Sequence, residues 1–161
     1  MNFAAPWSTA TKVLTVVTLI VLAVVQGVMM LNEVEWEVSA VVLTLSILVV
    51  AISFLFAPSS YGIDGTHLYI RRPLLPIQIR FNDILEVRRL NDQEMEFTLR
   101  LFGSGGLFGF FGLFYSRKLG WQRWYATRTG DLVGIVTNTK GWLVLSPDSP
   151  EAFVAALKKR L

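Results

Sequence analysis

The sequence predicts a membrane hairpin of two helices, followed by a small antiparallel β domain that one amphipathic helix closes. Val13–Leu31 contains 19 residues without a charge, and Val38–Ala57 contains 20. A hydrocarbon core about 30 Å thick needs roughly 20 helical residues to cross it. After residue 60 the apolar positions alternate with a period of two, and turn signals separate the runs. We therefore expect a transmembrane hairpin over 1–58, with spans at about 12–31 and 38–57, and one domain over 60–161.

The charges that flank the two spans predict an orientation. Lys12 precedes the first span, and the loop Asn32–Glu37 between the spans carries glutamates but neither lysine nor arginine. Because positively charged flanks stay in the cytoplasm, we expect a multi-pass protein with both termini on the cytoplasmic side. The residues after 60 carry 14 basic and 9 acidic side chains, a net charge of +5. This excess suits an anionic lipid surface, and an ordinary solvated basic surface is an equally good interpretation.

Small and polar residues within the spans predict where the helices pack. Ser39, Ser46 and Ser53 recur every seven residues and therefore share a helical face, and Gln26 is the only strongly polar residue in either span. The first span carries a similar row, formed by Thr11, Thr15 and Thr18. Such residues let helices approach closely and hydrogen-bond in lipid, although each serine can also bond a carbonyl of its own helix. Because neither span contains an ionisable group, we expect an anchor rather than an ion path.

About seven short strands are expected in the domain. Asp64-Gly65 is a strong turn signal, and Met95, Phe97, Leu99 and Leu101 alternate with polar residues as in a half-buried strand. The remaining strands are expected at 61–63, 67–72, 77–81, 84–90, 121–127, 132–137 and 142–145. A bent sheet or small barrel would bury the apolar faces of these strands.

A helix is expected at the C-terminal end of the chain. Ser149 and Pro150 supply an N-cap and a proline at the first helical position. Phe153, Leu157 and Leu161 then fall on one face, which we expect to cover one end of the sheet.

Three stretches resemble a known family. They are Ile63-Asp64-Gly65, then Phe81 to Val87, and finally Tyr125-Ala126-Thr127 through the helix entry Ser146–Phe153. Together they resemble bacterial pleckstrin-homology-like domains, in particular a membrane-anchored subfamily with a Gly/Phe-rich insert, here at 101–120. The resemblance covers about 60–161 and implies a partly open seven-stranded β-barrel with a C-terminal helix, in the bacterial cytoplasmic (inner) membrane. It implies little about activity, since this fold carries lipid binders, protein binders and scaffolds.

The segment Leu101–Ser116 contains five phenylalanines and five glycines and no charge. Three interpretations compete for it. Its phenylalanines fill the domain core, or they dip into the bilayer interface, or the segment is a third span. A nucleotide-binding loop is disfavoured because no P-loop lysine accompanies the glycines.

The interface interpretation defines the candidate membrane-contacting or partner-contacting residues. They are Phe102, Leu107, Phe108, Phe110, Phe111, Leu113 and Phe114, with the basic residues Arg71, Arg72, Arg117 and Lys118. The residues expected to pack the helices are Gln26, Ser39, Ser46 and Ser53.

No pattern in the sequence indicates catalysis. His67 is the only histidine, cysteine is absent, and the carboxylates are scattered, so we expect no enzyme, no metal site and no cofactor. The aromatic residues do not alternate with a basic stripe, so nucleic acid is not an expected partner, and no small-molecule substrate is indicated. The expected function is a membrane-anchored binding or scaffold module that contacts lipid head groups or a partner membrane protein. The alternative is a structural subunit of a homo-oligomeric or larger membrane transport complex, assembled through the hairpin.

Overall fold

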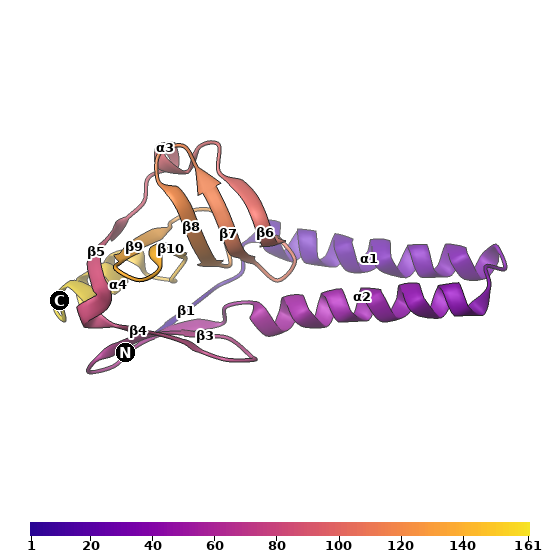
Figure 1. The fold of residues 1–161 in the computed structure, drawn as a ribbon, viewed down its shortest axis with the longest axis horizontal. Coiled ribbons are helices and arrows are strands. Elements are labelled where there is room, and N and C mark those ends of the chain that lie inside the picture. Colours follow the sequence, from indigo (N-terminus) through magenta and orange to yellow (C-terminus); the bar gives the residue numbers. More distant parts are fainter.

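The computed structural model describes residues 1–161, apart from the side chain of Asp92. Two long helices, α1 (Thr9–Leu31) and α2 (Trp36–Phe56), extend together from one side of a β-rich domain (Figure 1). The domain adds a 3₁₀ turn, η1 (Phe81–Asp83), and two further helices, α3 (Asp92–Met95) and α4 (Pro150–Lys158). The expected layout of two apolar helices, a β-sheet domain and a C-terminal helix is confirmed.

The strands form two sheets that do not close into a barrel. The first is antiparallel, with the order β1 (Asn2–Ala4), β2 (Ser60–Ile63), β3 (His67–Arg71) and β4 (Ile77–Arg80). The second has the order β5 (Ile84–Arg89), β9 (Val133–Thr137), β10 (Gly141–Leu145), β8 (Gly120–Ala126), β7 (Phe110–Ser116) and β6 (Leu99–Gly105). Within it β10 and β8 run parallel, and the other pairs are antiparallel. Nine of these strands lie within 60–161, where about seven were expected, and β1 lies before the helices.

The first sheet contains a strand that the sequence did not predict. Residues 2–4 pair with β2, with Phe3 opposite Tyr61, and the amide of Ile63 donates to the carbonyl of Met1 at 2.8 Å. The expected hairpin covers 1–58, whereas the structure places its first residues in the domain. Both helices are therefore inserted between two adjacent strands of one sheet.

The helices expose their apolar side chains. In the most apolar window of α1 only 6% of residues are buried, and in that of α2 none are. Ser8 caps α1 by accepting a hydrogen bond from the amide of Thr11 at 3.1 Å. At about 1.5 Å per residue, α1 is about 34 Å long. Both helices are long and apolar enough to span a membrane.

The main core lies between the two sheets and α4. Its fully buried side chains are Tyr61, Leu68, Ile70, Val133, Ile135, Leu143, Leu145, Phe153 and Leu157. A smaller cluster under the second sheet contains Leu90, Phe114, Trp124, Ala126, Leu132 and Val144. Leu161 lies beyond the end of α4 and is 53% exposed, so the apolar face of this helix is shorter than expected.

Candidate membrane-proximal surface

The tip of the β6–β7 hairpin packs against α1. The Thr15 hydroxyl donates to the carbonyl of Gly106 at 3.3 Å and accepts from the amide of Phe108 at 3.0 Å. Gly106 has a φ of +136°, and a Cβ atom there would lie 2.6 Å from the side chain of Leu14. The segment Leu101–Ser116 is thus a β-hairpin whose tip lies beside the first turns of α1, and the interpretation as a third span is wrong.

The phenylalanines of this hairpin divide between the tip and the core. At the tip, the Phe108 ring lies 5.5 Å from that of Phe54 in α2 and 5.8 Å from that of Trp7. Phe111 is 8% exposed and Phe114 is 5% exposed, so neither is available to a membrane, contrary to the expectation. Leu107, Phe110 and Leu113 are half-buried.

An apolar strip on β6 to β8 is exposed. Leu99 stands opposite Tyr115, and Tyr115 stands opposite Trp121, so the three share one face of the sheet. The exposed strip comprises Phe97 (81% exposed), Leu99, Leu101, Phe102 (78%), Tyr115 and Trp121. The prediction of a half-buried strand from Met95 is therefore wrong in its start and in its burial. The strand β6 begins at Leu99, and its apolar side chains face outwards. Of the predicted contact residues, Phe102 belongs to this strip.

Two hydrogen-bonded junctions hold the start of α1 against the domain. The Thr11 hydroxyl is buried and donates to the carbonyl of Thr127 at 2.6 Å. The Thr127 hydroxyl in turn donates to the carbonyl of Pro6 at 2.8 Å, and its amide donates to the Ser146 hydroxyl at 2.8 Å. Thr11 and Thr15 were expected to pack against the second helix, but both face the β domain. Helical spacing predicts that Thr11 and Thr15 share one face of the helix, but it does not predict which element that face contacts.

The chain leaving α2 is fixed by a buried tyrosine. Tyr61 lies five residues after the end of α2, and its side chain is completely buried. Its hydroxyl donates to the carbonyl of Tyr125 at 2.6 Å and accepts from the amide of Ser146 at 3.1 Å. Burial raises the pKa of Tyr61 to about 12. The sequence offered no signal for this role, because a tyrosine in a strand is common.

The predicted basic residues do not form one patch. Arg72 places its guanidinium 5.2 Å from the ring centre of Phe56, at the end of α2. Arg71 is exposed at the end of β3. Arg117 and Lys118 are exposed in the turn between β7 and β8, which is the end of β7 remote from the tip on α1. Of these four residues, Arg72 is the one with a described contact to a helix.

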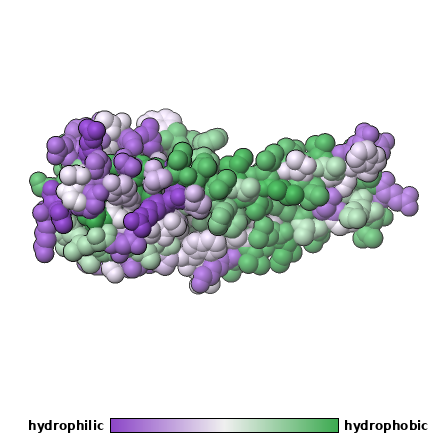
Figure 2. Space-filling model, turned by 90° about the horizontal axis from the view of Figure 1, so that it is seen from below, coloured by the Kyte–Doolittle hydropathy of each residue, from purple (hydrophilic) through white to green (hydrophobic). Residues whose placement is uncertain are grey.

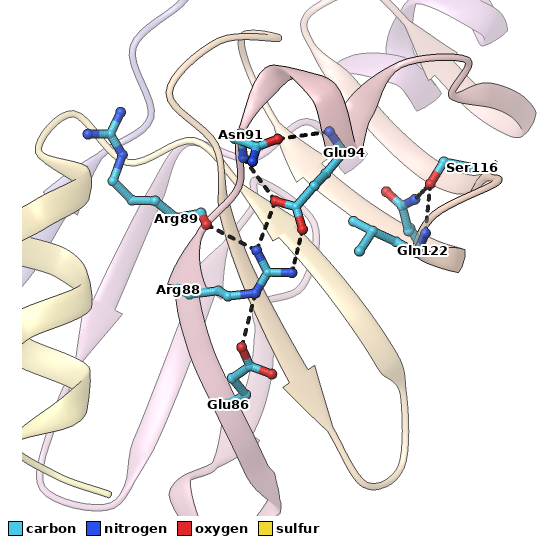
Figure 3. Close-up of polar contacts among 8 residues, drawn as sticks. Glu86, Arg88, Arg89, Asn91, Glu94, Ser116 and Gln122 are labelled. Carbon is cyan, nitrogen blue, oxygen red and sulfur yellow. Dashed lines mark hydrogen bonds and ion pairs between the residues drawn. The ribbon is translucent and has the colours of Figure 1, made fainter.

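A second group of charges stabilises the domain itself. Arg88 donates to both carboxylate oxygens of Glu94, at 2.9 and 2.7 Å, and pairs with Glu86 at 3.0 Å (Figure 3). Glu94 also accepts from the amide of Asn91 at the start of α3. Hydrogen bonding from Arg88 is the main cause that lowers the pKa of Glu94. This network holds α3 against β5, and we assign it a structural role.

The two helices enclose a crevice rather than a tight seam. Its volume is about 770 Å³, and its walls include Leu22, Ser46, Val50 and Phe108. Near its loop end Gln26 donates to the Ser39 hydroxyl, while the Gln26 Oε1 atom is buried without a described partner. Ser46 donates to the carbonyl of Val42 in its own helix at 2.8 Å, and Ser53 is half-buried.

The apolar surface of the helices continues onto the adjoining end of the domain. Figure 2 shows a continuous apolar belt between polar atoms at the loop end of the hairpin and polar atoms over the remote part of the domain. This distribution is compatible with association of the helices with a membrane.

Comparison with known proteins identifies the β domain. The family model for a bacterial PH domain matches residues 59–161. No curated protein and no solved structure matches the chain.

Proposed function

The chain belongs to the bacterial PH domain family, and from this premise we propose that it is a membrane-anchored binding module. In this proposal α1 and α2 cross the cytoplasmic membrane as a hairpin, and the domain contacts lipid head groups or a partner membrane protein. The attachment of the domain to the hairpin is the observation that supports it most. Hydrogen bonds from Thr11 and Thr15 join the start of α1 directly to the domain, and a hydrogen bond from Tyr61 fixes the chain that leaves α2. The near side of the domain is therefore held at a fixed position relative to the ends of the helices.

The proposed orientation places the domain and both termini in the cytoplasm. Lys12 lies at the domain end of α1, whereas Glu33, Glu35 and Glu37 lie at or beside the loop end of the hairpin. Positively charged residues favour the cytoplasmic side, and this supports the assignment. The bacterial family of the domain supports the bacterial cytoplasmic membrane as the location.

We propose binding without a chemical reaction. His67 lies on β3 beside Thr66, whose hydroxyl is 2.7 Å from the Nδ1 atom of His67. The backbone amide of His67 donates to the Asp64 carboxylate, but no carboxylate is among the described hydrogen-bond partners of the imidazole ring. In the described part of the chain, no three residues of the types that bind metals come together. The exposed strip offers instead an apolar surface with aromatic side chains, which is typical of contact with a partner or an interface.

A crosslinking experiment in whole bacteria tests this function. A photoreactive amino acid replaces Phe102 in the exposed strip, and a matched variant carries it at Thr139, an exposed loop residue outside the strip. We expect adducts with lipid or with a membrane protein from position 102 and none from position 139. Equal labelling from both positions, or none from position 102, contradicts a binding role for this surface.

Topology is tested separately. Because the chain has no cysteine, single cysteines at Glu35 and Ala155 report on opposite ends of the molecule without background labelling. A membrane-impermeant thiol reagent is expected to label position 35 in intact spheroplasts, and position 155 only after lysis. The reverse pattern contradicts the proposed orientation.

The crevice between the helices supports a second candidate, a subunit of a homo-oligomeric or larger membrane complex. A buried Gln26 Oε1 without a described partner is costly in lipid, and small residues on the crevice walls admit another helix. Extraction in a mild detergent followed by mass measurement tests it. A strict monomer counts against this candidate and leaves the binding module intact.

A further inference from the structure

The loop between β3 and β4 lies directly beside the end of α2. Its residues are Pro73, Leu74, Leu75 and Pro76, which we call the leucine loop. The amide of Leu74 donates to the carbonyl of Leu55 in the last turn of α2 at 3.1 Å. Figure 1 shows the β3–β4 hairpin extending from below the domain toward the domain end of α2, with a loop of this hairpin at the level of that end. The backbone bond places the leucine loop at the same level as the final residues of the apolar helix.

The leucine side chains of this loop are not used by the domain. Leu74 is 46% exposed and Leu75 is 63% exposed, and neither belongs to a described core cluster. Both flanking prolines are exposed as well. Two adjacent exposed leucines at the end of a membrane helix have no packing role inside the described molecule.

Two backbone polar groups of the leucine loop have hydrogen-bond partners. Proline has no amide hydrogen, so its four residues carry only two donors, and the donor of Leu74 is bonded to α2. The carbonyl of Leu75 accepts from the Nε atom of Arg72 at 2.9 Å. A peptide group that is already bonded loses less on leaving water than a free one. These two bonds therefore reduce the free-energy cost of moving the loop into a less polar layer.

We propose that the leucine loop inserts Leu74 and Leu75 into the interfacial layer of the bilayer. The inference rests on the proposed function, since it requires α2 to span the membrane. Arg72 lies between the loop and the ring of Phe56, which leaves its guanidinium at the head-group level, where phosphate is the matching anion. Lipid is the favoured occupant because the loop is hydrogen-bonded to the last turn of α2, a helix whose most apolar window contains no buried residue. The loop thus gives the domain a membrane contact of its own beside the hairpin.

Depth measurement with spin labels tests this assignment on the full chain in anionic liposomes. Single cysteines replace Leu75, Leu45 in the middle of α2, and Ala155 on α4, which lies at the end of the domain remote from the helices (Figure 1). Oxygen concentrates in lipid and a nickel chelate stays in water, so the ratio of their effects reports depth. We expect the label at 75 to be intermediate between the deep label at 45 and the aqueous label at 155.

The outcomes separate the inference from its premise. A label at 75 as accessible to the nickel chelate as that at 155 overturns the insertion while α2 still spans. A label at 45 that is open to the chelate overturns the spanning helix itself. Protection of position 75 from both reagents indicates contact with protein and also overturns the lipid assignment. As a second measurement, we expect L74S/L75S to raise the accessibility to the nickel chelate of a label at Gln78→Cys, which lies on β4 two residues after the loop, with the circular dichroism spectrum unchanged. An unchanged accessibility at position 78 overturns the insertion.

Discussion

Replacing Gly106 with alanine tests the junction between the β6–β7 hairpin and α1. Gly106 has a φ of +136°, a region that residues with a Cβ atom rarely adopt. The added carbon would lie 2.6 Å from Leu14 Cδ1 and 3.2 Å from Leu14 Cβ. The first atom ends a flexible side chain and can rotate away, whereas the second is fixed to the helix. The backbone conformation is therefore the larger cost.

We expect G106A to lower the free energy of unfolding by about 1–3 kcal/mol from backbone strain alone. For a chain of this size, each kcal/mol corresponds to about 2–4 °C in the melting temperature. The expected decrease is therefore about 2–12 °C. A rotamer change at Leu14 adds up to about 1 kcal/mol. The double variant L14A/G106A separates the two contributions, because it relieves the contact and leaves the strain.

Thermal unfolding of the full chain in a mild detergent, followed by circular dichroism, measures the effect. Gly130 is the matched control, since it lies in an exposed loop with no atom within 4 Å of an added Cβ. G130A is expected to leave the melting temperature nearly unchanged or to raise it slightly. Equal melting temperatures for G106A and G130A would refute the reasoning, because the tip would then not be held in this conformation.

Three further predictions concern the domain. Burial raises the pKa of Tyr61 from 10 to about 12, so the contribution of Tyr61 to the free energy of unfolding is full below pH 10 and is lost as the pH rises towards 12. By urea unfolding, we expect Y61F to lower the free energy of unfolding by about 1–3 kcal/mol and to depend less on pH in the alkaline range. Hydrogen bonds from the amides of Thr66 and His67 lower the pKa of Asp64 to about 2, so the contribution of Asp64 to the free energy of unfolding is full above pH 4 and is lost towards pH 2. If D64N and the native chain lose stability equally between pH 4 and pH 2, this reasoning is wrong. The ring of Phe3 lies 5.1 Å from that of Phe153. By urea unfolding, we expect F3A to lower the free energy of unfolding by about 2 kcal/mol and the control N2A to leave it unchanged.

The sequence predicted the elements whose signals are local. The helical hairpin follows from two uncharged runs, the turn between β2 and β3 from Asp64-Gly65, and the start of α4 from Pro150. Each of these features depends on residues that are adjacent in the chain. The resemblance to bacterial PH domains, confirmed over 59–161, predicted the β domain with its C-terminal helix.

The features that were missed depend on contacts between distant residues. A strand of three residues, β1, has no periodicity of its own, and only its pairing with β2 identifies it. The alternation at Leu99 and Leu101 predicted one shared face, but alternation cannot indicate whether that face meets the core or remains exposed. Two of the predicted contact residues, Phe111 and Phe114, are buried, while the contact role of the segment stays a prediction.

The insertion of the hairpin between β1 and β2 has a consequence for biosynthesis. The first sheet cannot form when residues 2–4 leave the ribosome, because their partner follows only after both helices have been made. In the proposed orientation, β1 remains unpaired while the 23 residues of α1 and the 21 residues of α2 enter the lipid, and its capture by β2 then closes the sheet. Under that proposal, the sheet is completed only when the second helix has brought the chain back to the side on which β1 lies.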